Sequence, residues 1–109
     1  MINQRQIDYA TTYKYSFEEN NQEVARGLLY VLKDDAHKEP FGLMSDIHVK
    51  SKYREKGYGT KIVKHIIQQA KDKGCYKLML SSKESRGLES WYLNLGFKKH
   101  STTYRINLK

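Results

Sequence analysis

The segment from Asp46 to Thr60 holds the residues whose types and spacing best suit chemistry with an anion. It reads as a strand, a basic turn with glycines at 57 and 59, and then a helix. The first turn of a helix has unpaired N–H groups and a partial positive charge, which together attract anions. Gly57 and Gly59 lack the side chains that would keep a phosphate from those amides, and Arg54 and Lys56 add charge. The segment therefore predicts a phosphate-binding turn.

Two common phosphate motifs do not match this turn. A P-loop has glycine followed by Lys and then Ser or Thr, whereas Gly59 is followed by Thr60 and Lys61, the reverse order. The Rossmann fingerprint needs three spaced glycines, and Ile62 occupies the third position. The turn therefore matches neither class of nucleotide site.

Alternation of residue types predicts the strands around the turn. We expect strands, in chain order, over residues 9–17, 24–32, 41–49, 76–80 and 97–108. The polar, turn-forming residues 18–22 predict a direct connection between the first two strands.

Helical spacing predicts two helices. Apolar residues at 62, 63, 66, 67 and 70 predict one helix after the glycine turn, and Gly74 is placed to end it. The second would have Ser81, Ser82 and Ser85 as N-cap candidates and Leu88, Trp91, Tyr92 and Leu95 on its inward face. The order is β-β-β-α-β-α-β, an α/β (α+β) fold with a mixed, largely antiparallel sheet and two main helices.

Length and composition indicate one domain spanning residues 1–109, since 39% of the residues are hydrophobic, enough for one core. No apolar run is long enough for a bilayer, and no signal peptide follows Met1, so we expect a cytoplasmic protein. Cys75 is the only cysteine, which excludes an internal disulfide. It precedes an apolar run and is interpreted as structural rather than catalytic. No metal site is predicted.

The charge balance favours an anionic partner. Twenty Lys and Arg against twelve Asp and Glu give a net charge of +8, and many of the basic residues fall between positions 50 and 64. Such an excess attracts nucleic acid, an anionic membrane or a phosphorylated cofactor, and charge alone leaves these alternatives open.

The pattern Arg54-x-x-Gly57-x-Gly59 resembles the pyrophosphate-binding signature of the GCN5-related N-acetyltransferases (GNAT). The preceding residues 46–49 are similar to that family's splayed central strand. The segment Ser90-Trp91-Tyr92-Leu93-Asn94-Leu95-Gly96-Phe97 resembles its later signature, an aromatic-Tyr pair followed by Leu-Gly-Phe. The two motifs occur in the family's order, with a predicted strand between them, and the resemblance covers residues 41–97.

The resemblance implies acetyl-coenzyme A as cosubstrate and assigns residues to it. The pyrophosphate would lie on the backbone amides of Arg54, Glu55, Lys56, Gly57, Tyr58 and Gly59, with a hydroxyl from Thr60. The pantetheine arm would pair with the central strand near Ile47 and Val49, where an amide would also hold the developing oxyanion. Ser85 occupies a position at which the family often has Asn. Its side chain is shorter than that of Asn for the same hydrogen-bonding contact with the cosubstrate.

For catalysis, the resemblance implies direct transfer of an acetyl group to a primary amine. Tyr92 matches the tyrosine with which many members protonate the departing thiolate, although it also fits the packed face of its helix. The amine must lose a proton before it attacks, and many relatives place a carboxylate or His on the central strand for this. Asp46 and His48 are the candidates here. A regular strand would turn them away from the face of Leu43, Ser45 and Ile47, and a bulge would reverse this.

One departure from the family concerns the N-terminal half. Members of the family usually have two helices between the first strand and the next hairpin. In this chain, residues 18–22 leave no space for such helices. The acceptor site is therefore either open, suited to a large substrate, or completed by a second subunit. Exposed aromatic residues in 9–17 would favour a homodimer.

Three functions remain as alternatives. The first is an active N-acetyltransferase, and the second is an acetyl-coenzyme A-binding module that has lost efficient chemistry. The third is a basic, nucleic-acid- or ribosome-associated protein, which no RNA-binding signature supports. A basic protein repels polycations, so an acidic or neutral acceptor is preferred to a polyamine.

Overall fold

The computed structural model describes all 109 residues. Its elements, in chain order, are β1 (Ala10–Glu19), β2 (Gln22–Leu32), β3 (Phe41–Val49), the 3-10 turn η1 (Ser51–Tyr53), α1 (Tyr58–Asp72), β4 (Leu78–Met79), the 3-10 turn η2 (Glu84–Arg86) and α2 (Glu89–Asn94). The strands form one sheet in the order β1-β2-β3-β4. The first three run antiparallel, and β4 is parallel to β3. The expected mixed, largely antiparallel fold with two helices is confirmed.

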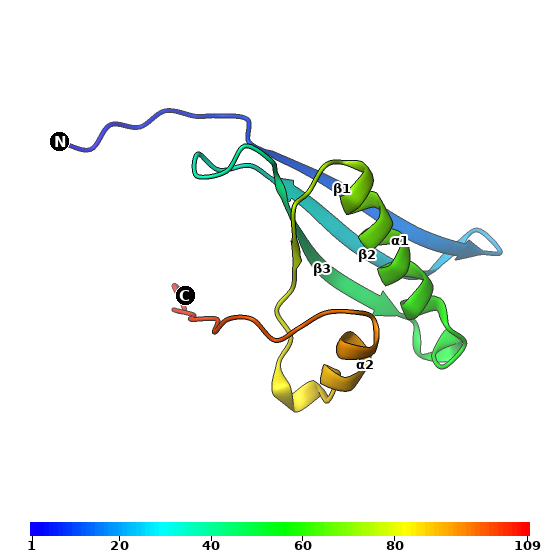
Figure 1. Cartoon of the computed structure of the whole chain (residues 1–109). Coiled ribbons are helices and arrows are strands. Elements are labelled where there is room, and N and C mark those ends of the chain that lie inside the picture. The colour runs from blue at the N-terminus through cyan, green and yellow to red at the C-terminus, as the bar shows by residue number, and fades with distance from the viewer.

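The expected last strand is not formed. Residues 97–109 contain no strand, and the predicted fourth strand shrinks to Leu78–Met79. Alternation indicates which residues suit a sheet, but a strand also needs a paired neighbour, and this segment pairs with none of the four strands. Figure 1 shows it leaving α2 and passing away from the sheet.

A tight hairpin joins β1 to β2. Asn20 and Asn21 have φ values of 52° and 62°, the conformation that two-residue hairpin turns require and that Asn tolerates. The predicted direct connection is therefore confirmed, and no helix lies between the first two strands.

Helix α1 covers one face of the sheet and closes the core (Figure 1). Its buried residues are Ile62, Val63, Ile66 and Ala70, and they pack on Ala25, Leu29 and Met44. Gly27 allows this close approach, because a Cβ there would lie 2.6 Å from Ile47 Cδ1 and 2.8 Å from Ile62 Cγ2.

The aromatic residues of β1 face α1 and are half-buried. Tyr15 packs edge-on to His65 with ring centroids 4.9 Å apart, and Phe17 packs in the same way on Tyr58 at 5.4 Å. Tyr13 lies under the ammonium of Lys73. The exposed aromatic surface that would have favoured a dimer is therefore absent from β1.

A bulge interrupts β3 at Asp46, whose φ is 55°. Arg26 is paired with His48 and Leu28 with Ser45, so two residues of β3, Asp46 and Ile47, face one residue of β2. The bulge turns Ile47 toward α1, whereas a regular strand would leave it with Leu43 and Ser45. The expected common face of these three residues is therefore wrong.

The start of α2 also differs from the expectation. The helix begins at Glu89, and Leu88 at the N-cap makes no capping hydrogen bond. Gly87, at φ 66°, separates it from η2, so none of the three serines caps it.

Candidate active site

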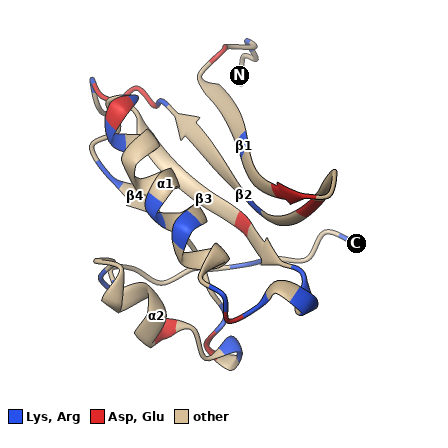
Figure 2. Cartoon of the chain, turned by 90° about the vertical axis from the view of Figure 1, so that its right-hand side faces the viewer, with Lys and Arg blue, Asp and Glu red and all other residues tan.

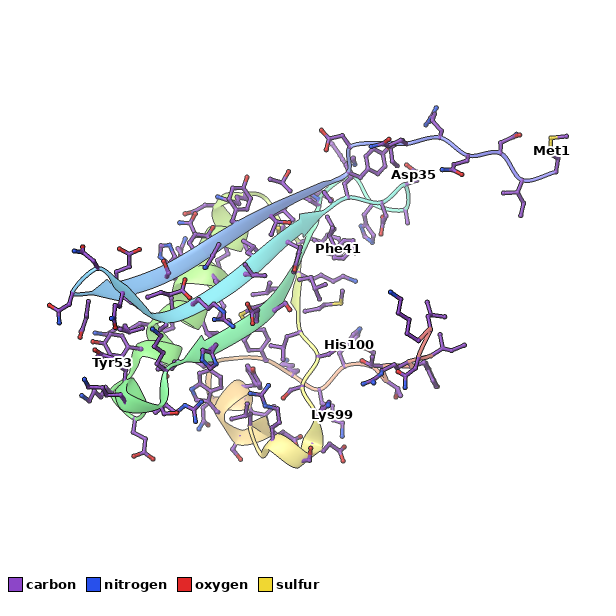
Figure 3. The ribbon with its side chains drawn as sticks, turned by 180° about the vertical axis from the view of Figure 1, so that it is seen from behind. Met1, Asp35, Phe41, Tyr53, Lys99 and His100 are labelled. Atoms are coloured by element: carbon purple, nitrogen blue, oxygen red, sulfur yellow. The ribbon has the colours of Figure 1, made fainter.

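A cleft of about 980 Å³ lies where β3, the connection to α1 and helix α2 meet. All the residues predicted for the site line it except Lys56 and Ser85: Asp46, Ile47, His48, Val49, Arg54, Glu55, Gly57, Tyr58, Gly59, Thr60 and Tyr92. Figure 3 shows Tyr53, which also lines the cleft, just beyond this end of the sheet, with Phe41 at the other end of β3.

The turn before α1 presents a run of free backbone amides. None of the N–H groups from Glu55 to Thr60 donates to a carbonyl or a side chain, and the first paired amide is that of Lys61, 3.0 Å from Gly57 O. Glu55 and Gly57 have φ values of 63° and 87°. Left-handed residues within such a turn direct successive amides to one side, where they bind anions. A phosphate is the ligand that this geometry suits.

The charges around the turn also favour the binding of an anion. No acidic residue lies in the first turn of α1, so the positive end of the helix dipole is not neutralised there. Arg54 donates from Nε to Val49 O at 3.0 Å, which holds its guanidinium beside the end of β3. Figure 2 shows Lys and Arg gathered along the connection between β3 and α1.

Strands β3 and β4 separate beside the cleft. They pair only at Gly42 and Leu43, so the rest of β3, from Met44 to Val49, has no strand on this side. The unpaired backbone of that edge can bind an extended chain as a further strand would. A ligand could therefore lie along β3 with its anionic end on the free amides.

One side-chain hydrogen bond joins helix α2 to the start of α1 beside the cleft. Trp91 donates from Nε1 to Thr60 Oγ1 at 3.1 Å. Its ring lies over Gly59, where a Cβ would be 3.6 Å from Trp91 Cζ2. Gly59 therefore leaves space between the indole and the free amides, and a large side chain there would fill it.

Tyr92 lines the same cleft next to Trp91. Its ring packs on Trp91 at 4.9 Å and edge-on to Phe97 at 5.9 Å, which positions it firmly. Burial raises the pKa of the Tyr92 phenol above its usual value of 10, and the nearby charge of Arg86 opposes this. The phenol is therefore protonated throughout the neutral range and can donate a proton.

Asp46 and His48 lie side by side at the bulge and both line the cleft. The Asp46 carboxylate accepts two hydrogen bonds from Arg26, at 2.9 and 3.2 Å. These bonds, together with the charges of Arg26, His48 and Lys14, lower the pKa of Asp46. A carboxylate held in this way is a weak proton acceptor. The His48 side chain is exposed and makes no such pair.

Lys56 and Ser85 lie outside the lining. Lys56 places its ammonium 5.7 Å from the centre of the Tyr53 ring, at the exposed side of the turn. Ser85 is exposed in η2, where its neighbour Arg86 faces the cleft. No group of three or more His, Cys, Asp and Glu side chains is placed to hold a metal ion. No helix combines the length and apolar character needed to cross a membrane.

The free amides, the splayed strand and the tyrosine agree with a family-level comparison. The model of the acetyltransferase (GNAT) family matches residues 3–97. The chain belongs to this family. The match to the family model covers the β1–β2 hairpin as well as the glycine turn and the segment around Tyr92.

Among its GNAT relatives, glucosamine 6-phosphate N-acetyltransferase from Trypanosoma brucei brucei is 33% identical over 67 residues, 62% of this chain and 44% of that protein. N-alpha-acetyltransferase 30 from Xenopus laevis is 35% identical over 81 residues, 72% of this chain and 30% of that protein. The chain thus spans less than half the length of either. A crystal structure of a Trypanosoma brucei acetyltransferase superposes with a TM-score of 0.79 at 25% identity, covering 91% of this chain and 69% of that one.

Sequence reasoning missed several residues of this GNAT cleft. Trp91 packs against the core as expected, but it also lines the cleft and donates a hydrogen bond to Thr60, which was not predicted. The segment after β4 contributes Leu80, Ser81, Ser82, Arg86 and Leu88. Ser81 and Ser82 were predicted only as helix caps, and their place beside the cleft depends on the separation of β3 and β4, which no local pattern signals.

Proposed function

We propose that this protein transfers an acetyl group from acetyl-coenzyme A to a primary amine by direct attack. The observation that carries the proposal is the run of free amides from Glu55 to Thr60, at the end of a strand whose outer edge is unpaired. Family membership supports the same donor, because GNAT proteins generally use acetyl-coenzyme A. We also infer that residues 1–109 form a single domain, because one cluster of apolar residues joins the sheet to both helices.

The donor would lie in the cleft with its pyrophosphate on the free amides and its pantetheine arm along β3 near Ile47 and Val49. Lys56 and Arg54 would add charge at the turn, and Thr60 would remain able to donate a hydrogen bond while accepting one from Trp91. Ser85 would need to move to reach the donor, since it lies outside the cleft lining.

Proton transfer is assigned to two side chains of the cleft. The amine nitrogen bonds to the acetyl carbon and the carbon–sulfur bond breaks, so the thiolate needs a proton and the amine must lose one. Tyr92 supplies the first, since its phenol is protonated at neutral pH. His48 is better suited than Asp46 to remove the second, because Arg26 occupies the Asp46 carboxylate, whereas the exposed His48 side chain lines the cleft and forms no ion pair.

The acceptor is proposed as a primary amine that is neutral or acidic overall. The names of the two relatives specify different acceptors, glucosamine 6-phosphate and alpha-amino groups, and N-acetylation is common to them. A net charge of +8 disfavours polycationic acceptors.

The test is release of coenzyme A thiol from acetyl-coenzyme A in the presence of a panel of primary amines. We expect release with at least one neutral or acidic amine, and loss of that activity in Tyr92→Phe. Tyr76→Phe is the matched control, since this tyrosine is exposed and outside the cleft. Binding of acetyl-coenzyme A without release by any amine would favour a binding module.

A further inference from the structure

Strand β2 carries apolar side chains on both of its faces. Ala25 and Leu29 face α1 and lie in the core. Leu28, Tyr30 and Leu32 alternate with them and project from the opposite face. None of these three belongs to the core cluster or packs against it, yet each is half-buried. Figure 3 shows β1 and β2 in front of α1, with no helix across this side of the sheet.

Strand β3 extends this second apolar surface. Tyr30 is paired with Leu43 and Leu32 with Phe41, and side chains directly opposite each other share a face. Neither Leu43 nor Phe41 belongs to the core cluster. We call the resulting surface the open face, which consists of Leu28, Tyr30, Leu32, Phe41 and Leu43. An apolar surface that is bordered by polar groups is typical of a binding site.

The open face leads to the proposed base of the reaction. Arg26, two residues before Leu28, is paired with His48, so the imidazole lies on the same side of the sheet. Along β2, Leu28 is roughly 7 Å from this pair and Tyr30 roughly 14 Å. His48 and Leu43 both line the cleft as well. A molecule whose reacting amine lies at His48 therefore extends its body over the open face.

The charged groups beside the open face neutralise one another. Lys14 lies 2.6 Å from Glu23, and Arg26 lies 2.9 Å from Asp46. The two cations and two carboxylates leave no net charge next to the apolar side chains, although the whole chain carries +8. The open face therefore suits a body that is uncharged as well as apolar.

We infer that the open face binds the acceptor, and that the acceptor is a primary amine carried on an extended, uncharged apolar body. The inference rests on the proposed acetyl transfer and narrows its acceptor from neutral or acidic amines to apolar ones. The amine lies at His48 and the body over Leu28, Tyr30 and Leu43. An alkyl chain and a peptide whose first side chains are apolar present the same chemistry to this face.

A series of n-alkylamines tests the inference. With ethylamine, butylamine, hexylamine and octylamine, KM for thiol release should fall roughly three- to four-fold for each CH₂ that the open face covers. Leu28→Thr should flatten this dependence, raising KM for octylamine about 10-fold more than KM for ethylamine. Val31→Thr is the matched control and should keep the dependence, because Val31 lies on the same strand but packs against the core. An equal KM for all four amines, or a dependence as steep in Leu28→Thr as in the control, would overturn the inference.

Calorimetry with octylamine in the presence of coenzyme A separates this inference from the proposed function, because binding needs no turnover. We expect octylamine to bind at least about 10-fold more tightly than ethylamine, and Leu28→Thr to remove most of that difference. Such binding without thiol release by any amine would contradict the acetyl transfer and still support the apolar site. Acetylation of amines that bind with equal affinity would support the transfer and exclude the open face as the acceptor site.

Two further measurements identify the source of the apolar body and the competing occupant. Peptide amides that begin with Leu-Phe or with Ser-Gly extend the series, and a KM for the Leu-Phe peptide below that for octylamine would assign the open face to a peptide acceptor. Light scattering tests for a second copy of the chain. A dimer that Tyr30→Asp converts to a monomer would place that copy on the open face and overturn the inference.

Discussion

Trp91 donates a 3.1 Å hydrogen bond from its indole to Oγ1 of Thr60, and this bond joins α2 to the first turn of α1. The two residues are 31 positions apart in the sequence. Their contact sets the distance between the free amides of the turn and the tyrosine that follows Trp91. The donor and the proton source of the proposed reaction are therefore positioned by the same bond.

Removing the acceptor of this bond should weaken the fold. In Thr60→Val the half-buried indole N–H has no partner, so we expect the free energy of unfolding to fall by about 1 kcal/mol. Thr60→Ser retains the hydroxyl and should lose less than half of that. Urea denaturation followed by the fluorescence of Trp91, the only tryptophan, measures both. Equal stability of the two variants would show that the bond contributes nothing.

The stability of the fold should respond differently to a methyl group at two of the glycines. In Gly27→Ala the new Cβ meets Ile47, Ile62 and Ile66 at 2.6 to 2.9 Å, and crowding of this kind costs roughly 1–3 kcal/mol. In Gly59→Ala the nearest atoms are 3.6 Å away, an ordinary contact, and the fold should keep its stability. Chemical denaturation compares the two. A Gly27→Ala variant as stable as wild type would mean that α1 does not pack so closely on β2.

The pair between Arg26 and Asp46 predicts how stability depends on pH. The pKa of Asp46 is lowered in the folded protein, so the stabilisation is present above its unfolded pKa of about 3.9 and is lost as pH falls through the lower folded value. Asp46→Asn is a suitable variant, because Asn also tolerates the φ of 55°. We expect wild type to melt higher than Asp46→Asn at pH 7, and this difference to shrink below pH 4. Glu39→Gln, at a carboxylate in no ion pair, should show no such difference.

Tyr92→Phe should separate binding from chemistry. The phenyl ring keeps the packing on Trp91 and Phe97 but has no proton to give, so we expect turnover to fall about 100-fold or more. Binding of acetyl-coenzyme A should change less than two-fold. Because burial raises the pKa of Tyr92, loss of its proton should not limit wild-type activity until the pH exceeds 10. Full turnover in Tyr92→Phe would remove the tyrosine from the mechanism.

The sequence predicts what local patterns determine. The β1–β2 hairpin and α1 follow from alternation, from Asn20-Asn21 and from helical spacing, and the structure has them within about two residues of the expectation. The glycine turn was recognisable because an anion site on a helix N-terminus needs only consecutive residues. Of the residues from 54 to 60, all except Lys56 line the cleft.

What the sequence does not predict depends on contacts between distant segments. The bulge at Asp46 arises from the pairing of β3 with β2 and reverses which side Ile47 faces. Trp91 has the spacing of a core residue, and only the approach of α2 to α1 shows that it bonds to Thr60. Residues 97–108 have the alternation of a strand, but they pair with none of the four strands of the sheet.

Calorimetry of acetyl-coenzyme A binding tests the central claim most directly. We expect wild type to bind with a dissociation constant on the order of micromolar, about −8 kcal/mol. Gly59→Trp should abolish binding while its circular dichroism stays unchanged, because the new side chain fills the space between Trp91 and the free amides. Gln68→Trp, on the exposed face of α1, is the matched control and should bind as wild type does. A well-folded wild type that does not bind, or a Gly59→Trp variant that binds equally well, would contradict the account.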